Sequence, residues 1–328
     1  MIRVAVGVLQ RDDGRTLLMQ RLPGTFREGQ WECPGGKIEA GEDSLQALVR
    51  ELHEELGIKV GNARPRITLR HAYPEKTVLL EVWQVTQFTG QPHNLEGHQL
   101  RWVTPAELRR SETLDADRPI ITSLELPDTY VITPTLATDD ASESAQWLKQ
   151  LELTLDQGVS LLQLRCPGWS PANFARLAKT VARYCDASGT KLLLNGDPEQ
   201  VLSLSEKLGA AGCHFPVRYL DRLTGMQRPD GLLIGASCHS AAELAAAASA
   251  DVDFCVLGPV LPTASHRQRS ALNWPGFEDA VKKANLPVFA LGGLAAGDLE
   301  TAWQRGAQGV AGISGFWSRR STSLNQHR

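Results

Sequence analysis

From about residue 129 onwards, short apolar runs alternate with Ala- and Leu-rich segments of helical character. Regular alternation of strand and helix is typical of a parallel sheet covered by helices. Eight such runs in about 190 residues suit a compact (β/α)₈ TIM barrel, slightly below the usual size of that fold. We expect the barrel strands at residues 130–133, 161–164, 191–194, 212–215, 232–235, 254–257, 288–291 and 310–313.

The first 125 or so residues have a different texture, in which strand-like runs surround one well-marked helix near residues 43–56. This mixture predicts an α+β domain. We expect its strands at residues 4–9, 16–20, 77–88 and 100–103.

The length of 328 residues is about twice the usual size of a domain, so we expect two domains. The natural boundary is the stretch 114–129, which ends in Leu126-Pro127-Asp128. The expected parts are therefore an α+β domain at 1–127, the barrel at 128–318 and a polar tail at 319–328.

The charge balance excludes some partners. Lys and Arg number 34 against 37 Asp and Glu, and a net charge of −3 gives no basic field for a nucleic-acid backbone or an anionic membrane. We expect no direct DNA binding and no membrane association. No run of about 18 apolar residues occurs, and the start of the sequence lacks the layout of a signal peptide. We therefore expect a soluble, cytoplasmic protein.

The six cysteines never form a C-x-x-C pair and mostly lie in apolar stretches. Zinc sites and disulfide frameworks fit this pattern poorly. Because a free cysteine packs as a small apolar residue, we expect six buried thiols, at Cys33, Cys166, Cys185, Cys213, Cys238 and Cys255.

The helix near residues 43–56 is bounded at both ends. Asp43 followed by Gln46 three residues later is a capping-box pattern, and Gly57 stands where a left-handed cap ends a helix. At about 100° per residue, five apolar side chains fall in one sector and predict the core face. They are Leu45, Leu48, Val49, Leu52 and Leu56.

Three carboxylates, Glu51, Glu54 and Glu55, gather on a sector roughly opposite the apolar one. Like charges one turn apart repel by a few tenths of a kcal/mol per pair, so the cluster is unfavourable unless a cation occupies it. A divalent hard cation is the obvious occupant. A solvated acidic face is the alternative, and this segment alone leaves both open.

The residues around the helix make the pattern more specific. Gly36 is followed after five residues by Glu42, and after seven more by Arg50-Glu51-Leu52. Glu54-Glu55 and Gly57-Ile58 then follow, each after a gap of one residue. All nine fixed positions match the Nudix box, and residues 1–125 resemble the MutT-type Nudix hydrolases. The resemblance implies that the α+β domain has the Nudix fold.

The resemblance also implies a metal-dependent reaction. In Nudix enzymes the box helix binds Mg²⁺ or Mn²⁺ against a nucleoside diphosphate linked to a further group, and water attacks a phosphorus atom. MutT-like members convert a nucleoside triphosphate to the monophosphate and pyrophosphate. Glu55 and the carbonyl group of Gly35 match the tightest metal ligands of the family, and Glu51 and Glu54 complete the cluster.

Two further residues belong to the implied catalytic set. Arg50 lies one turn before Glu54, where it is placed to pair with that carboxylate and orient it. Glu96, in Leu95-Glu96-Gly97-His98, resembles the distal ligand or base of the family. Metal ions in such a set clamp pyrophosphate oxygens and lower the pKa of bound water.

The signals for the substrate are weaker. Arg21 resembles the MutT arginine that meets phosphate or base edges, and a surface arginine is the alternative. Cys33-Pro34-Gly35-Gly36 resembles MutT sequence around the nucleotide. Phe26 could stack on the base, although a lone aromatic residue is more often packing.

Asp117 stands where the bacterial MutT pattern has an asparagine that reads an oxidised guanine. An amide both donates and accepts hydrogen bonds, whereas an ionised carboxylate only accepts. The base specificity therefore departs from the MutT pattern unless burial keeps Asp117 protonated.

Strand-end motifs run along the second half, among them Leu162-Gln163-Leu164-Arg165, Gly235-Ala236-Ser237-Cys238-His239, Leu257-Gly258-Pro259 and Ala290-Leu291-Gly292-Gly293. On these motifs the second half resembles the thiamine phosphate synthase and TenI family over essentially its whole length. Barrels of this kind hold phosphate on backbone amides after the last two strands. The phosphate candidates here are Gly292, Gly293, Ile313 and Ser314.

His239 matches a histidine that transfers protons in TenI-type tautomerases, although a lone histidine at a strand end is common. Several charged positions of the synthases differ in this sequence. Asn195-Gly196-Asp197 replaces the Asn-Asp-Arg of the third strand, and the second Asp is missing after the fourth strand. Cys166-Pro167-Gly168 and Ala264-Ser265-His266 stand where the family has basic residues. These losses remove charge partners that release of a diphosphate needs.

The sequence supports three hypotheses. The first is a Nudix pyrophosphohydrolase of a nucleoside triphosphate, with 8-oxo-dGTP as first candidate, fused to a degenerate barrel. Such an enzyme would clean the nucleotide pool and so limit mutation without binding DNA. The second directs the same chemistry to a thiamine-related diphosphate. The third makes the barrel a module that binds a phosphorylated ligand, and its rival is a barrel active as a thiamine phosphate synthase or tautomerase.

Overall fold

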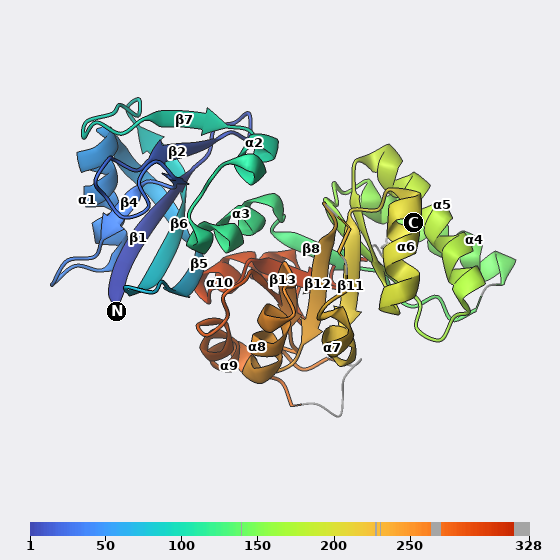
Figure 1. The fold of residues 1–328 in the computed structure, drawn as a ribbon. Helices are drawn as coiled ribbons and strands as arrows, with labels where there is room; N and C mark the ends of the chain where they lie inside the picture. The colour runs from blue at the N-terminus through green and yellow to red at the C-terminus, as the bar shows by residue number, and fades with distance from the viewer. Residues whose placement is uncertain (139, 227, 230, 264–269, 318–328) are drawn as a thin grey trace, which may run out of the picture. The chain divides into compact units, whose positions relative to one another are not determined.

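A computed structural model describes residues 1–138, 140–226, 228–229, 231–263 and 270–317 of the chain (Figure 1). It contains two compact units. One comprises Met1–Leu126 together with Trp274–Val288 and Glu300–Gln308, and the other begins at Pro127. The expected domain bounds remain a prediction. The expected tail at 319–328 and the Ala264-Ser265-His266 stretch lie outside the described residues.

The N-terminal domain contains two sheets, with strand orders β4-β1-β6-β5 and β3-β2-β7. Its strands are β1 (Ile2–Leu9), β2 (Thr16–Gln20), β3 (Trp31–Glu32), β4 (Gly35–Lys37), β5 (Lys59–Ala72), β6 (Thr77–Thr89) and β7 (Leu100–Val103). Its helices are α1 (Ser44–Leu56), α2 (Pro105–Arg110) and α3 (Arg118–Glu125).

The four strands expected in this domain are present as β1, β2, β6 and β7, whereas the sequence did not predict the short β3 and β4 or the long β5. β5 pairs antiparallel with β6, and register shifts around Asn62 and Pro65 interrupt the ladder. Its first half is rich in polar and charged residues, so it lacks the alternation of apolar and polar residues by which a half-buried strand is recognised.

Strand β1 is buried on both faces of its sheet. Val8 enters one apolar core, and Leu9 enters a second core that α1 covers. At Gly7 an added Cβ would lie 3.0 Å from a methyl carbon of Leu48 and another of Leu52. The absence of a side chain at Gly7 therefore lets α1 pack closely on β1, as Figure 1 shows for the two elements.

Helix α1 has the ends that the sequence predicts. The Asp43 side chain accepts hydrogen bonds from the backbone of Leu45 and Gln46, and the Gln46 side chain accepts from the Asp43 N–H group. Gly57 ends the helix with a φ of 68°, which favours glycine. Both predicted caps are confirmed.

The predicted faces of α1 are partly wrong. Leu45 and Val49 are exposed rather than in the core, and Glu55 is buried. Glu55 lies seven residues after Leu48, which places the two only about 20° apart around the helix. The acidic sector is therefore not opposite the core but overlaps it, and this overlap carries Glu55 into the interior.

The C-terminal domain is a closed barrel with the strand order β10-β11-β12-β13-β14-β15-β8-β9. Its strands are β8 (Thr129–Ile132), β9 (Leu161–Arg165), β10 (Lys191–Asn195), β11 (Gly212–Pro216), β12 (Leu233–Cys238), β13 (Phe254–Leu257), β14 (Val288–Leu291) and β15 (Gly309–Gly312). Helices follow the strands as α4 (Ala141–Leu155), α5 (Pro171–Ser188), α6 (Pro198–Leu208), α7 (Leu220–Leu223), α8 (Ala241–Ser249), α9 (Asn273–Val281) and α10 (Leu299–Gln304). The eight predicted barrel strands are confirmed, with shifts of a few residues at some ends.

Each of the six cysteines is buried and free, as expected.

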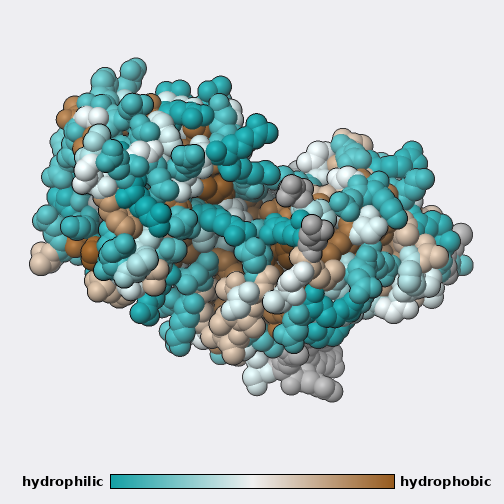
Figure 2. Space-filling view, viewed as in Figure 1, coloured by the Kyte–Doolittle hydropathy of each residue, from teal (hydrophilic) through white to brown (hydrophobic). Residues whose placement is uncertain are grey.

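Hydrophilic residues predominate on the face of the molecule drawn in Figure 2. Among the described helices, none is both long enough and apolar enough to cross a membrane.

The N-terminal domain has apolar cores of its own, because every member of the two clusters lies at or before Leu124. A domain with its own core is expected to fold alone. We therefore expect a fragment of residues 1–127 to be soluble and to retain the metal-dependent hydrolysis of the full chain. Circular dichroism and a hydrolysis assay on both proteins check this, and a fragment that does not fold would show that the two parts form one cooperative unit.

Candidate active site

Two glycines bring strand β4 against helix α1. Gly35 has a φ of 142°, and an added Cβ there would lie 2.2 Å from the carbonyl oxygen of Ala5. At Gly36 an added Cβ would lie 2.2 Å from the carboxyl carbon of Glu51. Gly35 excludes a larger residue because the clash is with backbone, and a side chain at Gly36 would displace the Glu51 carboxyl group. The backbone of β4 therefore passes directly beside the carboxylates of α1.

Glu55 is buried where α1 faces β4. The backbone N–H group of Gly35 donates to its Oε2 atom at 3.0 Å. Burial raises the pKa of Glu55 to about 8; the Gly35 hydrogen bond opposes this, and the charges of Glu51, Glu96 and Glu32 raise the pKa further. In the absence of a cation, this carboxyl group is therefore mostly protonated at neutral pH.

The other predicted ligands lie at different depths. Burial raises the pKa of Glu51, which remains close enough to Glu55 for their charges to interact. One ligand atom each from Glu55, Glu96 and His98 lies within 4.8 Å of the other two. Glu54 is more exposed, at the outer edge of the cluster. The structure thus brings Glu51, Glu55 and Glu96 together, and Glu54 and Glu96 are the exposed members of the cluster.

Arg50 ties the helix to the preceding loop. Its Nη2 atom donates to Glu42 at 2.7 Å and to the carbonyl oxygen of Lys37 at 3.0 Å. Its Nη1 atom donates to Glu51 and to Glu54, each at 3.0 Å. The predicted pairing with Glu54 is confirmed, and Arg50 orients two further carboxylates besides.

The donor set fits a divalent cation. Carboxylate oxygens are the ligands that hard cations prefer, and Glu51, Glu55 and Glu96 supply them from two directions. The raised pKa of Glu55 shows that its ionised form is unfavourable in this buried site, and a bound cation would make the ionised form favourable. The ligand role expected for the Gly35 carbonyl group stays a prediction.

Arg21 and Phe26, both expected at the nucleotide, already have protein partners. The Nη1 atom of Arg21 is 2.7 Å from both carboxyl oxygens of Glu32, and its Nε atom donates to the Phe26 carbonyl oxygen. The ring of Phe26 packs edge-on against Tyr73, with ring centroids 5.0 Å apart, and the Lys76 ammonium lies 4.1 Å from its centroid. Arg21 is thus a held, largely buried arginine rather than a free surface group.

Asp117 is buried at the start of α3, close enough to Glu32 and Cys33 to interact with their charges. Burial raises the pKa of Asp117 well above its usual value, and the charge of Glu32 adds to the rise. The neutral acid is thereby favoured, and this form both donates and accepts. Cys33 and Pro34 are also buried. Burial raises the pKa of the Cys33 thiol, which disfavours the reactive thiolate.

Glu32 and His98 are neighbours of the site that the sequence did not single out. Glu32 lies inside the Trp31-Glu32-Cys33 stretch, but its pairing with Arg21 depends on the folding of β3 against β2. His98 follows Glu96 by two residues, and its position depends on the loop before β7. In the sequence, the only indication of a role for Glu32 or His98 was its closeness along the chain to a predicted site residue.

At the barrel mouth, a cavity of about 460 Å³ lies at the carboxyl ends of the strands. All four phosphate candidates, Gly292, Gly293, Ile313 and Ser314, line this cavity. His239 lines it as well, with its Nδ1 atom 2.6 Å from the carbonyl oxygen of Gly258. Arg165, at the end of β9, contributes a cation to the same wall.

A polar chain fills the interior of the barrel. Asn195 donates to Gln163 at 3.0 Å, and Gln163 donates to the Tyr130 hydroxyl group at 3.0 Å. The Tyr130 oxygen lies 3.2 Å from Nδ1 of His214, whose Nε2 atom is 2.9 Å from the Ser237 hydroxyl oxygen. Burial lowers the pKa of His214 to about 3, so the imidazole is neutral.

The acidic partners of a synthase are not available at this mouth. Asp197 caps helix α6 and pairs with Arg222 at 2.7 Å, which commits its carboxylate to the local structure. Strand β11 ends at Pro216, and the following turn Val217–Tyr219 offers no carboxylate. The described residues therefore do not fit the Mg²⁺ and diphosphate chemistry of the synthases.

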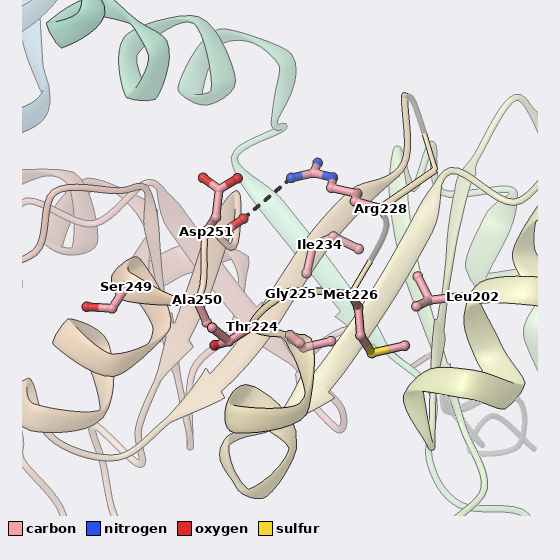
Figure 3. A pocket seen from close by; sticks show the side chains of 10 residues that line it. Leu202, Thr224, Gly225, Met226, Arg228, Ile234, Ser249, Ala250 and Asp251 are labelled. Atoms are coloured by element: carbon pink, nitrogen blue, oxygen red, sulfur yellow. Dashed lines mark hydrogen bonds between the residues drawn. The ribbon is translucent and has the colours of Figure 1, made fainter.

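A second cavity, of about 230 Å³, adjoins the amino end of β12 (Figure 3). Leu202, Met226 and Ile234 give it an apolar wall, and Arg228 closes one side by donating to the Asp251 carbonyl oxygen at 3.5 Å. None of the predicted site residues lines it. The barrel mouth is therefore the stronger ligand site of this domain.

The fold and the site define a two-domain chain, with a carboxylate-bearing helix in its α+β domain and a closed (β/α)₈ barrel as its second domain. Residues 5–123 match the family model described as NUDIX domain, and residues 129–316 match that described as thiamine monophosphate synthase. The chain therefore belongs to both families, one in each half, and its N-terminal domain is a Nudix hydrolase. Nudix hydrolases generally use divalent metal ions.

Relatives are known for each half. The 8-oxo-dGTP diphosphatase of Escherichia coli (strain K12) is 31% identical over 124 residues, which make up 38% of this chain and 96% of that protein. The CTP pyrophosphohydrolase of the same strain is 36% identical over 121 residues, 37% of this chain and 89% of that protein. The putative thiamine-phosphate synthase 2 of Aquifex aeolicus (strain VF5) is 29% identical over 193 residues, 59% of this chain and 99% of that protein.

Replacing Glu55 by Gln should reduce kcat by at least about a hundredfold, because a neutral amide is a poor ligand for a hard cation at nearly the same shape. Steady-state rates at saturating Mg²⁺ measure the loss. Glu39→Gln is the control, since Glu39 is exposed and lies in the loop between β4 and α1. Retention of most of the activity by the Glu55 variant would refute the metal assignment.

The raised pKa of Glu55 predicts a pH dependence of cation binding. Below about pH 8 the carboxyl group must lose a proton before it can act as a ligand. The apparent affinity for Mg²⁺ or Mn²⁺ should therefore rise as the pH rises towards 8, by up to about tenfold per pH unit. Calorimetric titrations in buffers of different ionisation enthalpy count the released proton, and Glu55→Gln should abolish that release.

Proposed function

We propose that the Nudix domain hydrolyses 8-oxo-dGTP to the monophosphate and pyrophosphate. The observation that carries the choice of base is the buried Asp117, whose environment favours a neutral carboxylic acid. Guanine presents two acceptors, O6 and N7, on one edge. Oxidation at C8 places a hydrogen on N7, so that the edge offers an acceptor beside a donor. A neutral acid offers the complementary donor and acceptor.

The residues of this chain divide the work on the triphosphate. Glu51, Glu55 and Glu96 would hold Mg²⁺ or Mn²⁺, with Glu54 at the edge of the set. A divalent cation in this position neutralises phosphate charge and lowers the pKa of water. Arg50 keeps the carboxylates in place through its hydrogen bonds to Glu42, Glu51 and Glu54.

We assign to Glu96 the removal of the proton from the attacking water, which its exposure relative to the buried Glu55 supports. The water oxygen forms a bond to phosphorus as the bond that joins the nucleoside monophosphate to the diphosphate breaks. The proton passes to Glu96, and pyrophosphate leaves. In this proposal Arg21, which pairs with Glu32, contacts a phosphate or base edge of the bound nucleotide.

A panel of substrates tests this function. We expect kcat/KM to be highest for 8-oxo-dGTP among 8-oxo-dGTP, dGTP, CTP, dCTP and thiamine diphosphate, with monophosphate and pyrophosphate as products. A preference for CTP would indicate instead that this chain shares the substrate named for its CTP pyrophosphohydrolase relative. A preference for thiamine diphosphate would support the rival hypothesis, in which both halves serve one pathway. In the proposed role the enzyme acts in the cytoplasm on free nucleotides and limits mutation without binding DNA.

For the barrel we propose a module that binds a phosphorylated ligand. Arg165 and the backbone at Gly292, Gly293, Ile313 and Ser314 line one cavity, whereas Asp197 is committed to Arg222. We expect thiamine phosphate to raise the Tm of the full chain, and Arg165→Gln to reduce that rise. Formation of thiamine phosphate from its two precursors, or tautomerase activity lost on His239→Ala, would show instead that the barrel is an enzyme.

The pKa of Asp117 supplies the sharpest test of base reading. In the wild type, the ratio of kcat/KM for 8-oxo-dGTP to that for dGTP should fall as the pH rises through the pKa of Asp117, because the donor is lost. In Asp117→Asn the ratio should stay constant with pH, since the amide keeps its donor. Asp115→Asn is the control, because Asp115 is exposed and pairs with Arg27. A ratio insensitive to both the mutation and the pH would place specificity elsewhere.

A further inference from the structure

The side chain of His98 is fixed by one hydrogen bond to the neighbouring strand. Its Nδ1 atom lies 2.9 Å from the backbone carbonyl oxygen of Gln20, at the end of β2. A carbonyl oxygen only accepts hydrogen bonds, so Nδ1 must carry the hydrogen. In the neutral imidazole the lone pair is therefore on Nε2.

That Nε2 atom faces the carboxylates of the Nudix site. It lies 3.7 Å from Oε2 of Glu96, which is too long for a hydrogen bond. Ligand atoms of His98, Glu96 and the buried Glu55 lie within 4.8 Å of one another. Donors at adjacent positions of one first-row cation, each about 2.1 Å from the ion, lie about 3.0–3.4 Å apart, so the three atoms would move closer by up to about 2 Å to bind one ion together.

We infer that His98 is a nitrogen ligand of the Nudix metal site, and that with Glu55 and Glu96 it favours Mn²⁺ and other transition-metal divalent cations over Mg²⁺. Magnesium prefers oxygen ligands and keeps much of its water, whereas imidazole is a good ligand for transition metals. The hydrogen bond to Gln20 is the kind of outer contact that fixes the tautomer and orientation of a metal-bound histidine. This inference rests on the proposed hydrolase function of the same site.

Two substitutions separate a ligand from a merely structural histidine. The amide nitrogen of Asn occupies the place of Nδ1, so His98→Asn keeps a donor for the Gln20 carbonyl oxygen and removes the ligand atom. His98→Gln instead places an amide group near the position of Nε2. If His98 has only a structural role, His98→Asn should bind metal ions as the wild type does. If His98 is a ligand, His98→Asn should bind them more weakly.

The experiment titrates the full-length protein with Mn²⁺, using electron paramagnetic resonance to measure the free ion, and with Mg²⁺ by competition. We expect His98→Asn to weaken Mn²⁺ binding by at least about tenfold and to change Mg²⁺ binding much less, so that the preference for Mn²⁺ falls. His93→Asn is the matched control, since His93 is an exposed histidine of the same loop, and it should bind both ions as the wild type does.

Pulsed electron paramagnetic resonance of the Mn²⁺-loaded wild type tests the ligand directly. We expect a nitrogen coupling that changes when the protein carries ¹⁵N-labelled histidine, and that is absent in His98→Asn. A wild type without histidine coupling, or a His98→Asn variant that binds Mn²⁺ like the wild type, would overturn the inference. The wild-type spectrum decides the question even if the variants do not fold. If the wild type hydrolyses 8-oxo-dGTP but shows no histidine coupling, the ligand role alone is refuted. If Glu55→Gln loses Mn²⁺ binding but the wild type hydrolyses no nucleotide, the proposed function alone is refuted.

Discussion

The close approach of β4 to α1 is the constraint on which the hydrolase site depends. A side chain at Gly36 would occupy the space of the Glu51 carboxyl group, and one at Gly35 would collide with the backbone of β1. Because both positions lack a side chain, the Gly35 N–H group reaches Glu55, and backbone covers that carboxyl group. The burial that raises the pKa of Glu55 is thus a property of the strand as much as of the helix.

Desolvation acts on two carboxyl groups in the same small domain. At Glu55 it keeps the carboxyl group largely protonated while no cation is bound, and Arg50 pairs with the neighbouring carboxylates of Glu42, Glu51 and Glu54. At Asp117 burial likewise favours the neutral acid, because the charge of Arg21 offsets it only in part and the charge of Glu32 adds to it. In the proposed function, Glu55 and its neighbours lie at the metal and phosphates, and Asp117 lies at the hydrogen-bonding edge of the base.

The sequence predicted the barrel and the capped helix α1 well, because both depend on local patterns of apolar residues and caps. It missed β5, whose bulges and polar residues hide its pairing with β6. It also placed the acidic face of α1 opposite the core, although the burial of Glu55 is decided by β4, which is distant in sequence. The nitrogen of His98 and the pairing of Arg21 with Glu32 likewise depend on strands coming together, so motif spacing could not reveal them.

The neutral His214 in the barrel interior gives the two domains opposite responses to acid and alkali. Its pKa is about 3 in the folded barrel against 6.5 in the unfolded chain, so between these values only the unfolded chain takes up the proton. Folding stability is then complete above about pH 6.5 and falls by up to about 1.4 kcal/mol per pH unit on acidification. Metal-free Glu55 has the opposite sign, because its raised pKa adds stability at low pH that is lost as the pH rises through about 8. Through these two residues, a fall in pH below about 6.5 destabilises the barrel, whereas a rise in pH towards about 8 destabilises the metal-free hydrolase domain.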